Sequence, residues 1–155
     1  MMPDADYTLL YPPIIQFGWG RRVALASILD RLSGSAPSHV LFVATNTAAT
    51  NGQLAELERL CPGDHDRLVG IPHDPALDVV ASIRDQARQC GANVVVAVGG
   101  GSAIDAAKAA AVLTHADGTV DDYFHGRHSI DGPGLPVVAL PTTAGTGAEI
   151  TKNSV

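Results

Sequence analysis

One junction constrains the fold more than any other part of the sequence. Five apolar residues, VVVAV at 94–98, run directly into Gly99, Gly100 and Gly101, and an alanine-rich segment follows at 103–113. A buried strand that passes through glycines into a helix is a basic unit of α/β folds. Three consecutive glycines also indicate that something lies too close to the backbone for side chains. The junction therefore predicts a strand–turn–helix unit with a candidate ligand site at its turn.

Similar units lie on both sides of this junction. Gly91 fits the end of the helix before it, and Pro75 fits that helix's first turn. Strands alternating with helices of ten or more residues predict a Rossmann-like α/β fold, a mostly parallel sheet with helices on both faces, in one domain over residues 1–155. The expected strands are 14–18, 39–45, 66–71, 94–98 and 137–140, the expected helices are 21–32, a segment ending near 60, 75–90 and 103–113, and 117–136 is a long connection.

Composition excludes several classes of function. With 155 residues, 46 % of them hydrophobic and 17 % charged, the chain is a globular domain able to bury its own core. The formal net charge of −6, with no stretch rich in Lys and Arg and few aromatic residues, argues against nucleic-acid binding. We expect a small-molecule ligand instead.

The sequence also indicates a cytoplasmic protein that does not enter a membrane. The N-terminal MMPDADYTLLYPP has neither the basic region nor the apolar run of a signal peptide, and no apolar stretch approaches the ~20 residues that span a bilayer. Cys61 and Cys90 lack any zinc-binding spacing, so we interpret them as reduced thiols.

The glycine turn has the chemistry of a phosphate site. The first turn of a helix leaves amide groups unpaired and carries partial positive charge, and glycines let a pyrophosphate touch the backbone. Ser102 is a candidate N-cap, with Asp105 three residues later completing a capping box. The pattern is not a full G-x-G-x-x-G, because Ile104 stands at the third glycine position. A tight turn without a ligand is therefore the alternative.

A second loop offers matching groups. The segment LPVVALPTTAGTGAEIT at 135–151 again follows an apolar run and adds flexible glycines. Short hydroxyls and glycine amides suit a diphosphate and a ribose. The alternative is a polar loop with local hydroxyl turns. The hydroxyl groups are those of Thr142, Thr143, Thr146 and Thr151.

Together, GGGSAIDAAKA and PVVALPTTAGTGAEIT resemble the paired motifs of the iron-containing (group III) alcohol dehydrogenase family, and PPIIQFGWG and VDDYFHG resemble further segments of it. The resemblance covers essentially the whole chain, as the N-terminal half of that family. It implies an α/β domain that binds NAD or NADP, a helical metal-binding domain not present in this chain, and an enzyme that interconverts small alcohols with aldehydes or ketones. It also implies a homo-oligomer.

The resemblance assigns roles to individual residues. Gly100, Gly101 and Ser102 would approach the pyrophosphate, and Thr142, Thr143, Thr146 and Thr151 would line the phosphate, ribose and nicotinamide. Many NAD-specific members carry an Asp that binds the adenosine ribose where Thr45-Asn46 stands here, so no carboxylate repels a 2′-phosphate and we expect weak discrimination between NAD and NADP. His73-Asp74-Pro75 and Ala148 replace the family's usual Asn-Pro and Ser.

The metal of this family, Fe(II) or Zn(II), is held by an Asp and three His in the missing half. The resemblance therefore implies no catalytic residue and no metal ligand in this chain, and an inactive chain on its own. We interpret the cluster Asp121, Asp122, His125 and His128 as solvated loop residues, and Lys108 as an ion-pair partner of Asp105.

Two alternatives remain open. One is a related superfamily member: a glycerol dehydrogenase, a maleylacetate reductase or a relative of 3-dehydroquinate synthase. The other is a non-catalytic nucleotide-binding module. The ending TAGTGAEITKNSV lacks a closing element and indicates an interrupted chain. A cleft face left exposed in this way should make the isolated chain associate.

Overall fold

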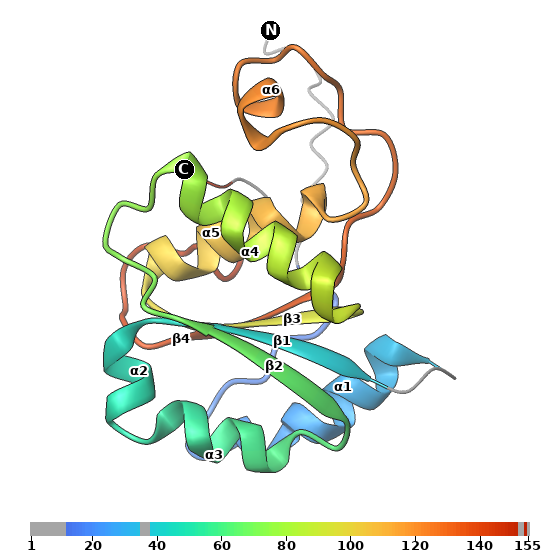
Figure 1. Ribbon diagram of the computed structural model, residues 1–155. Helices are drawn as coiled ribbons and strands as arrows, with labels where there is room; N and C mark the ends of the chain where they lie inside the picture. Colours follow the sequence, from blue (N-terminus) through green and yellow to red (C-terminus); the bar gives the residue numbers. More distant parts are fainter. Residues whose placement is uncertain (1–11, 35–37, 152–153, 155) are drawn as a thin grey trace, which may run out of the picture.

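A parallel four-stranded sheet lies between two layers of helices in the computed structural model, which describes residues 12–34, 38–151 and 154 (Figure 1). The strand order is β2-β1-β3-β4, and every neighbouring pair is parallel. This confirms the predicted Rossmann-like α/β fold. The strands are β1 (His39–Ala44), β2 (Asp64–Val69), β3 (Val94–Gly99) and β4 (Val137–Pro141).

The two central strands are apolar throughout because helices cover both of their faces. Leu41 and Val43 of β1 face one helical layer, while Val40 and Phe42 face the other. On one side α4 (Leu77–Cys90) and α5 (Gly101–Leu113) cover the sheet, and α6 (Val120–Phe124) packs against α4 beyond them (Figure 1). The other layer holds α1 (Leu25–Ser33), α2 (Asn46–Thr50) and α3 (Gln53–Leu60).

Small side chains bring α5 close to the sheet. Its alanines at 103, 106, 107, 110 and 111 are all buried, so the helix packs its backbone near β3 and β4. Gly91, in the left-handed conformation with φ 67°, ends α4 as predicted, although α4 begins at Leu77 rather than at Pro75. None of the described helices combines the length and the apolar character needed to cross a bilayer.

The first predicted strand is wrong. Residues 14–18 have no strand partner in the described part of the chain, and Phe17 is 95 % exposed, so an apolar run alone did not make a strand. The helix expected at 21–32 opens instead as a 3-10 turn, Arg21–Ala24, before α1. The segment ending near residue 60 divides into α2 and α3 at Gly52, whose φ of 85° no regular helix permits.

The edge strand β2 begins at Asp64, two residues before the predicted start, and four of its six residues are solvent-exposed. It therefore carries polar residues where a central strand would not. The MMPDADYTLLY segment at 1–11, and parts of the SGSAPS loop and of the C-terminal TKNSV, lie outside the described residues.

The connection 117–136 contains a helix that the sequence interpretation missed. Thr119 and Asp122 form a capping box: the Thr119 hydroxyl accepts from the Asp122 amide, and the Asp122 carboxylate accepts from the Thr119 amide. The T-x-x-D spacing was the available signal. Asp121 and Asp122 thus lie on the short helix α6 rather than in a loop, and both pair with Arg127.

Candidate functional site

The candidate site lies where the order of strands reverses. From β1 the chain moves outward to β2 and then crosses back to β3 on the other side of β1. Open parallel sheets bind ligands outside the carboxyl ends of their strands at such a switch point. At that edge Thr45 follows β1, Gly100 follows β3 and Thr142 follows β4. Residues from three predicted segments therefore meet at one place.

The glycine turn opens α5 without a side-chain cap. Gly100 is the N-cap residue, with extended backbone at φ −77° and ψ −176°, and the first intrahelical bond runs from the Ile104 amide to the Gly100 carbonyl. The predicted capping by Ser102 is wrong, because α5 begins two residues earlier than expected and Ser102 lies inside its first turn. The four amides of residues 100–103 precede the first amide that donates within the helix, that of Ile104, and form the positive end of the helix dipole.

Threonine side chains pack directly on the glycines. A Cβ placed at Gly101 would lie 2.8 Å from Thr146 Oγ1, and one at Gly100 would lie 3.3 Å from Thr143 Oγ1. A Cβ at Gly99 would lie 2.7 Å from Thr45 Cγ2. Any residue larger than glycine at these three positions would therefore crowd a threonine side chain. The glycines have a packing role in addition to the predicted contact with a pyrophosphate.

A backbone hydrogen bond joins the two loops. The Thr142 amide donates to the Gly99 carbonyl at 2.8 Å, extending the pairing of β3 with β4 by one residue. Beyond it, Thr143 and Thr146 are exposed at the surface, and Gly145 has a φ of 130° that turns the loop back over α5. The hydroxyls are thereby held beside the unpaired amides and remain accessible to a ligand.

Thr45 closes the other side of the glycine turn. Its hydroxyl accepts a hydrogen bond from the Ala48 amide at 3.3 Å and caps α2. Its methyl group occupies the space that a side chain at Gly99 would need. The structure therefore gathers seven of the eight predicted cofactor residues around one turn. They are Thr45, Gly100, Gly101, Ser102, Thr142, Thr143 and Thr146.

Thr151, the eighth, lies farther along α5. Its hydroxyl is 3.3 Å from the Lys108 ammonium, which also donates to the Ala148 carbonyl at 3.0 Å and to Asp105 Oδ1 at 2.9 Å. The predicted ion pair of Lys108 with Asp105 is confirmed. The sequence interpretation missed that Lys108 ties the threonine loop to α5, because these contacts join residues some forty positions apart.

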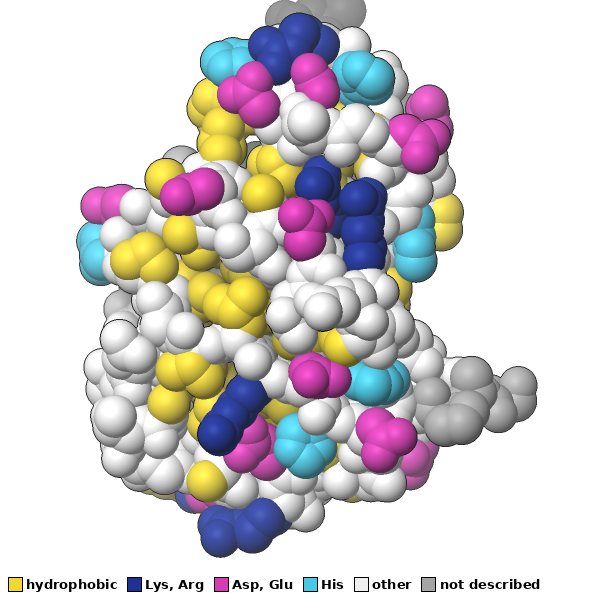
Figure 2. Space-filling view, viewed as in Figure 1, with side chains coloured by type: hydrophobic (Ala, Val, Ile, Leu, Met, Phe, Trp, Pro, Cys, Tyr) yellow, Lys and Arg dark blue, Asp and Glu magenta, His cyan; other side chains and the backbone are white. Residues whose placement is uncertain are grey.

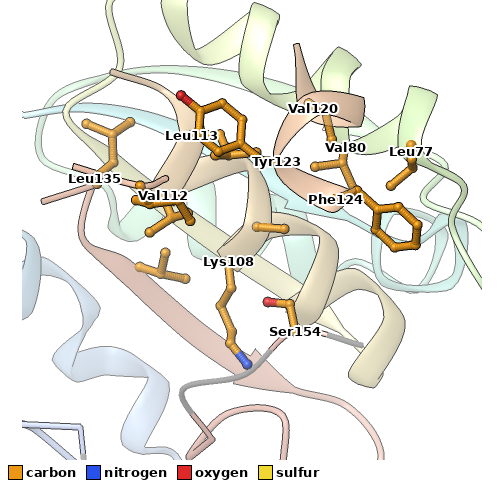
Figure 3. A pocket seen from close by; sticks show the side chains of 14 residues that line it. Leu77, Val80, Lys108, Val112, Leu113, Val120, Tyr123, Phe124, Leu135 and Ser154 are labelled. Carbon is orange, nitrogen blue, oxygen red and sulfur yellow. The ribbon is translucent and has the colours of Figure 1, made fainter. Parts of the chain in front are cut away.

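An apolar cavity of about 560 Å³ adjoins this tether (Figure 3). Tyr123 and Phe124 of α6, Val112 of α5 and Leu135 before β4 contribute to its wall, and Lys108 stands at its margin. The cavity contains none of the seven clustered residues, so it is a separate feature from the glycine turn.

Figure 2 shows that side chains of both charge signs are interspersed on one face of the molecule, with hydrophobic side chains exposed between them.

Comparison with known proteins identifies relatives of this chain. A family model described as iron-containing alcohol dehydrogenase matches residues 12–155. The long-chain-alcohol dehydrogenase 1 of Geobacillus thermodenitrificans (strain NG80-2) is 32 % identical over 153 residues, covering 95 % of this chain and 38 % of that protein. The sulfoacetaldehyde reductase of Bilophila wadsworthia (strain 3_1_6) is 44 % identical over 82 residues, covering 53 % of this chain and 21 % of that protein.

A solved structure has the same architecture. The crystal structure of sulfoacetaldehyde reductase from Bifidobacterium kashiwanohense in complex with NAD+ superposes with a TM-score of 0.84 at 29 % identity, covering 95 % of this chain and 39 % of that chain. The present chain therefore spans less than half the length of each of these three relatives.

Proposed function

Because the chain belongs to the iron-containing alcohol dehydrogenase family, we propose that it is the dinucleotide-binding part of an NAD(P)-dependent alcohol dehydrogenase. The observation that carries this proposal is the junction of Thr45, the glycine turn and the threonine loop at the switch point of the sheet. Such a junction suits a dinucleotide because it offers amide and hydroxyl donors around a helix N-terminus.

Each group then has a defined task. The amides of Gly101 and Ser102 bind the diphosphate oxygens at the positive end of α5. The hydroxyls of Thr143 and Thr146 donate to phosphate or ribose oxygens, and the Lys108 tether holds their loop in place. A nicotinamide bound there would accept a hydride from an alcohol or supply one to a carbonyl compound.

The chain's own residues do not fit the metal that the family name implies. In the part of the chain that the structure describes, the single group of three candidate ligands contains one histidine, and no aspartate meets three histidines. We propose that its ligands lie outside this chain and that the 155 residues alone do not turn over an alcohol.

The proposal includes the class of substrate and the setting. The names of the relatives support an alcohol or an aldehyde as substrate, without fixing its chain length. Exposed apolar side chains support a homo-oligomer, and two free thiols support a reducing, cytoplasmic location.

Titration of the 155-residue chain with NADH and with NADPH, followed by nicotinamide fluorescence, tests the proposal. We expect saturable binding of both, with dissociation constants within about tenfold of each other, since no carboxylate follows β1. In Gly101→Ala the new Cβ meets Thr146 and displaces the loop, so both affinities should fall by about tenfold or more.

The control variant is Ser82→Ala, on an exposed position of α4 away from the turn. It should bind both dinucleotides as the unchanged chain does. A chain that is folded by circular dichroism but shows no saturable binding of either dinucleotide would refute the proposed function.

A further inference from the structure

A second group of reactive side chains lies toward the opposite edge of the sheet from the glycine turn. His39 is the first residue of β1, Asp66 is in β2 and Cys90 is the last residue of α4. One ligand atom from each, an imidazole nitrogen, a carboxylate oxygen and the thiol sulfur, lies within 4.8 Å of the other two. All three residues are partly buried, so the group is neither dispersed in solvent nor sealed in the core.

The fold brings these side chains together on regular elements. In the register of β1 and β2, Asp66 pairs with Leu41, which faces α4, and His39 lies two residues before Leu41 on the same face. α4 crosses this face and ends at Cys90, where left-handed Gly91 turns the chain toward β3. The three donors therefore come from two strands and a helix rather than from a loop.

Both backbone groups of His39 form hydrogen bonds with Asn93. Its amide donates to Asn93 Oδ1 at 3.0 Å, and its carbonyl accepts from the Asn93 amide at 2.9 Å. Its ring nitrogen Nε2 lies 2.9 Å from Asp66 Oδ2. Preorganised ligands lose little freedom when an ion binds, so this anchoring favours a site over a chance proximity.

The donor set selects a class of ion. Imidazole, carboxylate and thiolate together suit Zn²⁺ and similar borderline cations, whereas Mg²⁺ and Ca²⁺ prefer oxygen donors alone. Three protein ligands with water in the fourth position is a common zinc arrangement. The Asp66 carboxylate and the Cys90 thiol lie side by side with the imidazole, so a divalent cation placed among them would have a carboxylate and a thiolate as anionic ligands.

We propose that His39, Asp66 and Cys90 form a binding site for a borderline divalent cation, with Zn²⁺ as its natural occupant. Binding forms a metal–Sγ bond and releases the thiol proton to solvent, and no electrons are transferred. The bound ion would tie β1, β2 and the end of α4 together. This site is distinct from the metal implied by the family name, because it contains one histidine and lies away from the glycine turn.

Titration of the metal-free 155-residue chain with Co²⁺ tests the proposal, because thiolate ligation of Co²⁺ produces a sulfur-to-cobalt charge-transfer band in the near ultraviolet. We expect one equivalent of Co²⁺ to generate this band, stoichiometric Zn²⁺ to abolish it, and Mg²⁺ to leave it unchanged. Absence of the band at stoichiometric Co²⁺ would overturn the proposal.

Variants assign the ligands. Cys90→Ser should eliminate the band, and His39→Gln and Asp66→Asn should each weaken Co²⁺ binding by about tenfold or more, since changes to outer-shell partners alone cost about 10- to 100-fold. Cys61→Ser and His65→Gln are the matched controls: His65 neighbours Asp66 but packs against Phe42 on the other face. A band that persists in Cys90→Ser, or that disappears in Cys61→Ser, would overturn the assignment.

Alkylation of the unchanged chain gives a readout that does not depend on a folded variant. Both cysteines are free and partly buried, so each reports on its own surroundings. We expect Zn²⁺ to slow the reaction of iodoacetamide with Cys90 and to leave the rate at Cys61 unchanged, as followed by peptide mass spectrometry. Equal Cys90 rates with and without Zn²⁺ would contradict the proposed site.

Discussion

Thr45 illustrates how one side chain serves both the fold and the candidate site. Its hydroxyl caps α2 through the Ala48 amide, while its methyl group lies against Gly99 of the glycine turn. The sequence identified this position only through the family resemblance. Its contact with Gly99 joins residues more than fifty positions apart, and local sequence patterns carry no information about such pairs.

This dual position allows a specific test of dinucleotide preference. Aspartate caps helices as well as threonine does, so Thr45→Asp should keep α2 while adding a carboxylate beside the glycine turn. We expect the affinity for NADPH to fall by about tenfold or more through repulsion of its 2′-phosphate, and the affinity for NADH to change much less. Parallel fluorescence titrations measure both.

Thr45→Ser is the control for this substitution, because it retains the capping hydroxyl and adds no charge. It should bind both dinucleotides like the unchanged chain. If Thr45→Asp lowered the two affinities equally, Thr45 would not face the adenosine ribose and its proposed role would be wrong.

The carboxylate of Asp122 is expected to titrate at an unusually low pH. The Thr119 hydroxyl and the Arg127 guanidinium both bind its carboxylate and hold its pKa well below the ordinary range of aspartate. A folded-state pKa below the unfolded one stabilises the fold at pH values above the unfolded pKa, and this contribution disappears as the pH falls through the lowered value. The cap of α6 should therefore persist through the ordinary carboxylate range.

Carbon-13 NMR of the Asp122 carboxyl group measures this titration directly. We expect a midpoint below that of an unperturbed aspartate, and a higher midpoint in Thr119→Val, which removes the hydroxyl but keeps the shape of the side chain. An unchanged midpoint in Thr119→Val would show that the capping hydroxyl does not control the Asp122 carboxylate.

At the scale of elements, arginines of α4 hold the end of α5. The Arg88 guanidinium donates to the carbonyls of Thr114 at 2.7 Å, Leu113 at 3.2 Å and Ala116 at 2.5 Å. Arg84, which is buried, donates to the Gly118 carbonyl at 3.0 Å. Positive charge at the C-terminus of a helix also opposes the negative end of its dipole. These bonds fix the route of the chain from α5 into α6.

Arg88→Ala should therefore lower the free energy of unfolding by about 1.5–3 kcal/mol, the net contribution of a hydrogen bond that involves a charged group. Urea denaturation followed by circular dichroism measures this loss. Arg31→Ala, on an exposed position of α1, is the control and should cost less than about 0.5 kcal/mol. Equal losses in the two variants would contradict a specific role of Arg88.

The elements differ in how far the sequence could predict them. The strands at 39–44 and 94–99 were predictable because a strand covered on both faces is continuously apolar. The run at 14–18 had the same character without a partner strand, and pairing is decided by tertiary structure. Helix α6 was missed because five residues are too few for helical periodicity to appear, although its capping motif was present.

At the scale of the whole molecule, a parallel sheet with helices on both faces could be predicted from the alternation of elements, whereas the strand order and the packing between loops could not. The predicted ligand residues met at one edge because every parallel strand presents its carboxyl end there. The Lys108 tether and the contacts of the glycines with Thr143 and Thr146 depend on the shape of the threonine loop. Such contacts arise only when the complete sheet positions both loops.

The surface of the molecule predicts its behaviour in solution. β4 is an edge of the described sheet and is only half-buried along Val137–Leu140, and edges of this kind pair readily with other chains. Phe17 and Trp19 are 95 % and 103 % exposed, far more than large apolar side chains usually are.

We expect the 155-residue chain to associate through these exposed apolar surfaces. Light scattering should give an average mass above the 16.0 kDa of one chain, rising with concentration. Phe17→Ser combined with Trp19→Ser should lower that mass, whereas Ile130→Ser, at a position 50 % exposed, should change it less. A mass equal to one chain at every concentration would contradict the association inferred from this surface.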